Sequence, residues 1–231
     1  MFTVLAAGCA TTAPRVRHER SVKPGINDPY KNPVVDEWVA RFESESREIF
    51  KHRRRILKAA GIRRGQTVAD IGAGTGLFVP LLSEAVGPEG KVLAVDIVPK
   101  FLAYIDKRAE QAGLTNVQTV LCDEDSVRLP PASIDVAFVC DTYHHFEYPH
   151  GTLRSIFDAL KPGGELIVID FIRDPNVSRA WILKHVRADE ATVRAEIESA
   201  GFVYAVDQPD DSFLKENYIL RFRRPVGRPA D

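Results

Sequence analysis

Short runs of β-type residues alternate with helical stretches between residues 67 and 171, and no other feature limits the fold of this chain as strongly. Strands are predicted at 67–71, 91–95, 117–121, 134–140 and 165–171, and helices at 77–86, 99–112 and 151–160. Several strand runs are almost continuously apolar, which is typical of strands covered by helices on both faces. Because this alternation requires crossover connections, the sequence predicts an α/β domain with a mainly parallel sheet.

The N-terminal part of the chain has a different character. Residues 1–33 carry prolines and glycines among polar residues without an apolar period after the first few positions, so we interpret them as a tail or lid. A helical pattern begins at Val34, and its apolar stripe starts with Val35, Trp38, Val39 and Phe42. Gly61 is a natural stop for this helical cap, because glycine readily ends helices.

The alternation of strands and helices stops in the C-terminal part of the chain. The pattern predicts a helix at 189–200 and strands near 202–207 and 217–223, the last two pairing as a hairpin-like unit. A chain of 231 residues that is 45% hydrophobic can bury one substantial core. We therefore predict one domain at 34–231, with a helical cap at about 34–61 and a core at about 62–224.

The strongest local motif is a strand that runs into a glycine-rich turn, VADIGAGTGL at residues 68–77. Gly72, Gly74 and Gly76 let the backbone approach a ligand closely, and the helix that follows offers free N–H groups. The spacing is not the GxGxxG of dinucleotide-binding folds, because the third glycine arrives one residue early. Asp70 adds a carboxylate to the same cradle, which suits a cofactor with an ammonium group better than a pyrophosphate.

A second acidic residue follows one strand-helix-strand unit later. Asp96 ends the predicted strand at 91–95 and lies 20 residues after Gly76. A carboxylate in this position can accept hydrogen bonds from both hydroxyls of a ribose, although a plain helix cap is the alternative. Together with the glycine turn, Asp96 indicates a nucleoside-containing cofactor.

From about residue 50 to residue 223, the chain resembles the class I S-adenosylmethionine-dependent methyltransferases, in particular the small-molecule branch that includes ubiquinone and menaquinone C-methyltransferases. The resemblance implies a Rossmann-like sheet of seven strands with the last strand antiparallel, and S-adenosyl-L-methionine as cofactor. It assigns the methionine and adenosine portion to Asp70, Gly72, Gly74 and Gly76, the ribose to Asp96, and the adenine to Asp125 and Ser126. The neighbouring Asp123 and Glu124 are alternatives for the adenine contact.

The same resemblance places the segment CDTYHHF, residues 140–146, beside the reactive methyl group. Methyl transfer is an in-line displacement at the sulfonium, so the protein supplies orientation and, where the acceptor carries a proton, a base. Tyr143, His144 and His145 are the candidates for these catalytic roles, and simple hydrogen bonding to the loop backbone is the alternative for the histidines. Because neighbouring side chains of an extended segment point opposite ways, we expect at most one histidine to reach the methyl group.

No metal site is predicted. The spacing of Cys140, Asp141, His144, His145 and His150 matches no structural zinc pattern, and the three cysteines include no CxxC pair. Cys122 and Cys140 are expected to behave as small hydrophobic residues in or beside strands.

Acceptor recognition in this family usually comes from the N-terminal segment and the insertion after the fifth strand, here about 20–50 and 172–188. The side chains of interest are Tyr30, Trp38, Phe42, Phe50, Phe171, Arg173, Trp181 and His185, with core packing as the alternative for the aromatic ones. Pro24, Gly25 and Pro29 are expected to shape a lid that orders when ligand binds.

Charge and hydropathy limit the partners. A net charge of -1 and an isoelectric point near 6.6 give no reason to expect nucleic acid or an anionic membrane, and no apolar stretch has the length of a transmembrane span. We expect a cytoplasmic enzyme with a small-molecule acceptor; the alternative location is a lipid anchor through Cys9, if the true start lies upstream. The alternative functions are a non-catalytic cofactor-binding protein and, less favoured, an NAD(P)-dependent oxidoreductase.

Overall fold

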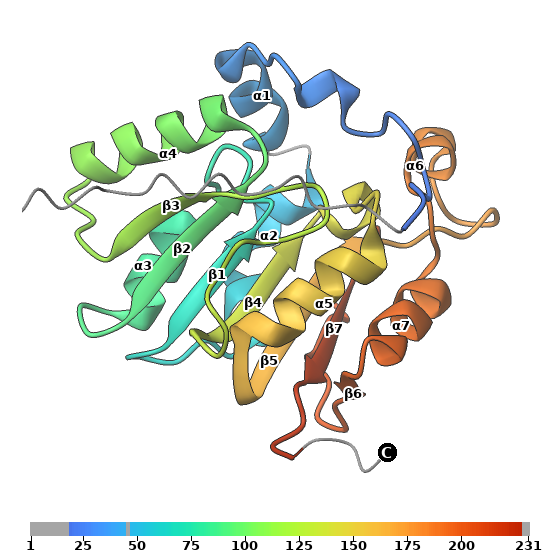
Figure 1. Ribbon diagram of the computed structural model, residues 1–231. Helices are drawn as coiled ribbons and strands as arrows, with labels where there is room; N and C mark the ends of the chain where they lie inside the picture. The colour runs from blue at the N-terminus through green and yellow to red at the C-terminus, as the bar shows by residue number, and fades with distance from the viewer. Residues whose placement is uncertain (1–18, 45–46, 228–231) are drawn as a thin grey trace, which may run out of the picture.

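The computed structural model describes residues 19–44 and 47–227, which form a seven-stranded sheet between layers of helices (Figure 1). The strands are β1 (Thr67–Ile71), β2 (Lys91–Asp96), β3 (Val117–Leu121), β4 (Ile134–Cys140), β5 (Leu160–Phe171), β6 (Val203–Tyr204) and β7 (Asn217–Arg223). Cys9, with its proposed lipid anchor, lies outside the described residues.

The strand order is β3-β2-β1-β4-β5-β7-β6. Strands β1 to β5 are parallel, and β7 runs antiparallel to both β5 and β6. The predicted Rossmann-like fold with an antiparallel last strand is therefore confirmed. The chain leaves β1 toward β2 and β3 and returns to β4 on the other side, so the switch in strand order lies between β1 and β4, where α/β folds bind ligands at the carboxyl ends of the strands.

The helices are α1 (Val35–Phe42), α2 (Glu48–Ala60), α3 (Val79–Val86), α4 (Pro99–Gln111), α5 (Pro149–Ala159), α6 (Ala180–His185) and α7 (Glu190–Ser199). Short 3-10 helices are η1 (Asp28–Tyr30) and η2 (Tyr143–His145). The helical cap is thus two helices rather than one, and Gly61 ends the second of them in the left-handed conformation, at φ +69°.

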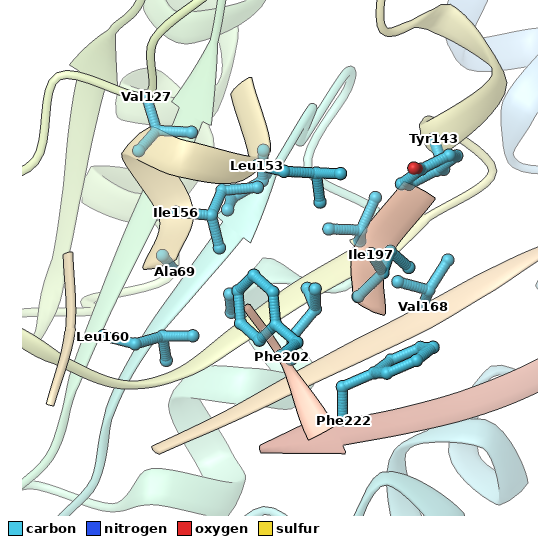
Figure 2. Packing of buried hydrophobic residues seen from close by; sticks show 14 of the residues in the cluster. Ala69, Val127, Tyr143, Leu153, Ile156, Leu160, Val168, Ile197, Phe202 and Phe222 are labelled. Carbon is cyan, nitrogen blue, oxygen red and sulfur yellow. The ribbon is translucent and has the colours of Figure 1, made fainter. Parts of the chain in front are cut away.

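Alternate residues of the central strands belong to two hydrophobic clusters, one on each face of the sheet. In β1, Val68 belongs to the cluster with α2 and α3, whereas Ala69 belongs to the cluster with α5 and α7. Figure 2 shows the second cluster, in which Leu153 and Ile156 of α5 approach Ile197 of α7 above the sheet. The continuous burial of β1 and β4 agrees with their nearly continuous apolar sequences.

Two boundaries differ from the sequence prediction. The strand predicted at 165–171 begins earlier, at Leu160: Leu160 pairs with Ile134, Glu165 pairs with Val136, and the residues between them form an irregularity in the pairing. Strand β6 has only two residues, because the chain leaves the edge of the sheet directly after Tyr204. Among the described residues, no helix is both long and apolar enough to cross a membrane.

Candidate active site

A cavity of about 910 Å³ opens at the carboxyl ends of β1, β2 and β4. This volume is near the upper end of the roughly 300–1,000 Å³ typical of small-molecule sites, so a cofactor and a small second ligand fit together. The cavity wall includes the glycine turn, Asp96, η2, α6 and parts of the segment 27–42, which therefore share one continuous space.

The glycine turn is held against the end of β2. Gly72 and Gly74 have φ of +71° and +55°, and both line the cavity, as does Asp70. The Asp96 carboxylate accepts hydrogen bonds from the backbone N–H of Gly74 and of Val98, each at 2.8 Å. Asp96 therefore fixes the turn and the start of α4 relative to each other while its side chain faces the cavity.

Asp70 and Asp96 are buried carboxyl groups, 3% and 5% exposed. Burial raises the pKa of Asp96 to about 6, although the backbone N–H donors oppose the shift. Burial and the nearby Asp96 raise the pKa of Asp70 to about 7. A cationic ligand between these groups would relieve both effects, because it compensates buried negative charge.

Gly76 is not part of the cavity wall. A Cβ atom at this position would lie 2.8 Å from Cγ1 of Ile105, and its φ is +79°. The structure therefore gives Gly76 a packing role against α4, whereas the sequence pattern placed it in the cofactor cradle. Gly76 was grouped with Gly72 and Gly74 because alternate spacing alone does not show which glycine faces a ligand and which faces a helix.

For the adenine contact, the structure favours the two alternatives, Asp123 and Glu124, over Asp125 and Ser126. Asp123 and Glu124 line the cavity, but Asp125 and Ser126 do not. The backbone N–H of Asp123 donates to the carbonyl of Ser126, which closes a tight turn and carries Asp125 toward Gly151 at the start of α5. The correction follows from this turn, which the sequence does not locate to within one residue.

Tyr143 points away from the cavity and into the core. It is fully buried, its hydroxyl donates to Oε2 of Glu196 at 2.8 Å, and its ring packs against Phe146 and under the guanidinium of Arg187. We therefore withdraw Tyr143 as a candidate base or acceptor contact. Figure 2 shows its ring at the edge of the α5–α7 cluster.

His144 and His145 both line the cavity, so the argument from an extended segment, in which neighbouring side chains point opposite ways, does not apply here. Their segment is a 3-10 turn rather than an extended strand, so successive side chains are separated by about 120° instead of 180°. The two ring centroids lie 4.3 Å apart. His144 Nδ1 lies 2.7 Å from Oδ1 of the buried Asp170, and His145 Nδ1 lies 3.1 Å from Oδ1 of Asn27.

Three polar residues of the wall were missed. The Arg47 guanidinium pairs with Asp141, and Asn217 Nδ2 donates to the other oxygen of Asp141 at 2.8 Å. Asp141 follows β4 with a φ of +51°, unusual for a residue with a side chain, and burial raises its pKa to about 6. These groups come from α2, β4 and β7, and no local sequence signal links them.

The segment 19–33 forms part of the cavity wall through Asn27, Pro29 and Tyr30. Glu147 accepts hydrogen bonds from the Ser21 hydroxyl and the Gly25 N–H, each at 3.0 Å, and Asn27 Nδ2 donates to the carbonyl of His145 at 3.1 Å. Glu19 accepts from two backbone N–H groups at the start of α5. The segment is thus anchored by side chains at both ends, as a lid would be.

Aromatic rings dominate this part of the cavity wall. Of the side chains singled out for acceptor recognition, the cavity is lined by Tyr30, Trp38, Phe42, Phe171, Trp181 and His185. Arg173 instead donates to the carbonyl of Val186, and Phe50 lies outside the wall under the guanidinium of Arg53. Tyr30 stacks at 4.5 Å from Trp38 and meets His145 edge-on at 5.1 Å.

Comparison with known proteins identifies the family to which this chain belongs. A methyltransferase-domain family matches residues 62–218, more than half of the chain. The ubiquinone/menaquinone biosynthesis C-methyltransferases UbiE of Salmonella newport and Salmonella agona are each 32% identical over 120 residues, 52% of this chain and 48% of the relative. The chain matches about half the length of these relatives.

Solved structures of methyltransferases have the same fold. A SAM-dependent methyltransferase from Aquifex aeolicus superposes with a TM-score of 0.71 at 25% identity, covering 83% of this chain and 99% of that one. An S-adenosylmethionine-dependent methyltransferase from Mesorhizobium loti has a TM-score of 0.59 at 20% identity, covering 75% and 97%, and shows the shared fold.

The seven-stranded sheet with an antiparallel β7 and the matches to methyltransferases place the chain among the class I S-adenosylmethionine-dependent methyltransferases. The chain belongs to the methyltransferase-domain family, and S-adenosyl-L-methionine is its cofactor.

Proposed function

We propose that this enzyme transfers the methyl group of S-adenosylmethionine to a small molecule that packs against aromatic side chains. The acceptor is held under the segment 19–33. The observation that supports this acceptor class is the continuous cavity, whose wall includes aromatic rings, three histidines and residues of an anchored segment. A cavity of this kind admits a small molecule more readily than a folded macromolecule.

The cofactor end is assigned to a small set of residues. Gly72 and Gly74 offer the close backbone approach, Asp70 faces the cationic methionine portion, and Asp96 accepts the ribose hydroxyls. Cys122, Asp123 and Glu124 wall the position proposed for the adenine. These placements put the sulfonium between the glycine turn and η2, because the cavity leads from one to the other.

In the transfer step, the acceptor atom donates its lone pair to the methyl carbon, and the carbon–sulfur bond breaks toward sulfur. The thioether product S-adenosylhomocysteine then leaves. The protein contributes alignment of the two reactants and exclusion of water. His145 is a poor proton acceptor, because burial lowers its pKa to about 2. The ring of His144 is held through Nδ1 by Asp170. We therefore assign both rings to positioning of the acceptor's polar group.

The first test is calorimetric titration with S-adenosylhomocysteine of the wild type and of Asp96→Ala. We expect micromolar-range binding by the wild type and a loss of at least about tenfold in the variant, because a hydrogen-bonded charged partner is worth about 1.5–3 kcal/mol. Glu89→Ala, at an exposed loop position, is the matched control and should bind normally. Equal binding by wild type and Asp96→Ala would contradict the ribose assignment.

The second test identifies the acceptor. Labelled cofactor is incubated with a panel of phenols, quinols, thiols and amines, and methylated products are detected by mass spectrometry. Methylation confined to proteins or nucleic acids added as alternative acceptors would overturn the proposed substrate class.

A further inference from the structure

Three histidines from two separate segments meet in the wall of the cavity. His144 and His145 belong to η2, and His185 ends α6, 40 residues further along the chain. One ligand nitrogen from each ring lies within 4.8 Å of the others, and Nε2 of His145 is 3.3 Å from Nε2 of His185. The family assignment gives no role to such a cluster.

The hydrogen bonds on the far side of two of these rings determine where their protons are. A carboxylate accepts hydrogen bonds only, so the 2.7 Å contact with Asp170 requires a proton on Nδ1 of His144. Asn27 donates through Nδ2 to a backbone carbonyl, so its Oδ1 must be the acceptor for the Nδ1–H of His145. In the neutral rings both Nε2 atoms therefore carry a lone pair.

Two other polar groups lie beside the cluster. The ammonium of Lys23 donates to the backbone carbonyls of Lys184 and His185. The hydroxyl of Tyr30 lies 3.4 Å from Nε2 of His145, a long contact that a metal ion at this nitrogen would replace. Neutral imidazole nitrogens with a lone pair are common metal ligands.

We propose that Nε2 of His144, His145 and His185 form a binding site for one divalent transition-metal ion of the zinc type. A tetrahedral ion with Zn–N bonds of about 2.0–2.1 Å separates two ligand nitrogens by about 3.3 Å, which is the spacing of the His145–His185 pair. Three imidazoles favour zinc, copper or nickel over magnesium or calcium, which prefer oxygen.

Asp170 and Asn27 accept the hydrogen bonds that metal-binding histidines usually donate from their second ring nitrogen. Metal-binding histidines usually donate their second ring N–H to a carboxylate or carbonyl oxygen, which fixes the ring and increases the basicity of the ligand nitrogen. His144 has the carboxylate and His145 has the amide oxygen. Asp170 also accepts the backbone N–H of His144 at 2.9 Å, so the ring is held in two ways.

Three protein ligands leave a fourth position for a ligand from the cavity. Given the proposed function, that ligand is the acceptor, bound through a phenolic oxygen, a thiol or a similar donor atom. The metal lowers the pKa of this atom, its proton leaves to water, and the lone pair attacks the methyl carbon as described above. The inference narrows the acceptor class to molecules with such a donor atom.

The test uses the full-length untagged chain after chelator treatment and dialysis. Zinc alone is titrated in competition with a chromophoric chelator, and Co²⁺ is added separately to record the visible absorption of a tetrahedral site. We expect one zinc per chain. His185→Ala and His145→Ala should each lose more than about a hundredfold in affinity, because losing even an outer hydrogen-bond partner of a ligand costs about tenfold to a hundredfold. His150→Ala, an exposed histidine near η2, is the matched control and should bind like the wild type.

His185→Gln serves as a second variant if alanine at this position prevents folding, and circular dichroism verifies the fold of each protein. No stoichiometric zinc binding by the wild type, or equal binding by the wild type and both variants, would overturn the metal site. S-adenosylhomocysteine titration of the same preparations separates the two proposals: normal cofactor binding without zinc binding removes only the metal, whereas zinc binding without cofactor binding removes the proposed function.

Discussion

Asp70 and Asp96 lie at the ends of neighbouring strands, where burial opposes their ionisation. For Asp70 the folded-state pKa of about 7 exceeds the ordinary 3.8, so the folded state retains the proton to a higher pH than the unfolded state. Stability is therefore lost as pH rises from about 4 to about 7. The enzyme tolerates this cost where a cationic cofactor will bind.

Asp70→Asn removes this titration. We expect the variant to melt close to the wild type near pH 4.5 and at a higher temperature near pH 8, by an amount corresponding to roughly 1 kcal/mol or more. Thermal unfolding of both proteins without cofactor between these pH values measures the difference. A difference in melting temperature that does not change with pH would show that burial does not raise the pKa of Asp70.

The packing role of Gly76 against α4 can be tested by a single substitution. Gly76→Ala should destabilise the fold by about 2 kcal/mol or more, from its positive φ and from overpacking against Ile105. Gly65→Ala is the matched control, because Gly65 has the same φ of +79° with nothing within 4 Å of the added atom. Chemical denaturation compares them, and equal losses would contradict the packing role.

Among the elements, the segment 19–33 and η2 form one unit. Glu147 follows η2 and binds the segment near Ser21 and Gly25, and Asn27 binds η2 itself. Apart from Ile26 and the Tyr30 ring, the contacts are mainly hydrogen bonds at a partly exposed surface, so we expect this unit to open at a lower free energy than the sheet.

Glu147→Ala is expected to release the lid. Limited proteolysis should cleave the variant faster within 19–33 than the wild type, and S-adenosylhomocysteine should slow cleavage of the wild type. Glu89→Ala is the control at an exposed position. A wild-type cleavage pattern unchanged by cofactor would count against a lid that orders on binding.

At the scale of the whole molecule, the site proposed for the cofactor lies where the glycine turn, β2 and the helical cap meet. Glu43, after α1, accepts hydrogen bonds from the Thr75 hydroxyl at 3.0 Å and from Arg108 at 2.7 Å. The cap, the glycine turn and α4 are therefore linked directly, and a ligand held by the turn stabilises the assembly.

S-adenosylhomocysteine at about 100 times its dissociation constant should stabilise the folded state by about 2.7 kcal/mol. For a chain of this length, this corresponds to a rise in Tm of roughly 5–10 °C. Scanning fluorimetry with increasing ligand measures the shift, and Asp96→Ala should show a much smaller one. Equal shifts in both proteins would place the ligand elsewhere.

The sequence by itself determined the parallel sheet, the glycine turn and Asp96, because apolar periodicity and turn residues act between near neighbours. It did not show which way Tyr143 points or that Asp123 and Glu124, rather than Asp125 and Ser126, line the cavity, since a 3-10 turn and a tight backbone turn decide these. Only the tertiary structure brought His185 to His144 and His145, and Asn217 to Asp141. These contacts join distant segments, so they depend on how the helices and strands pack rather than on any local pattern.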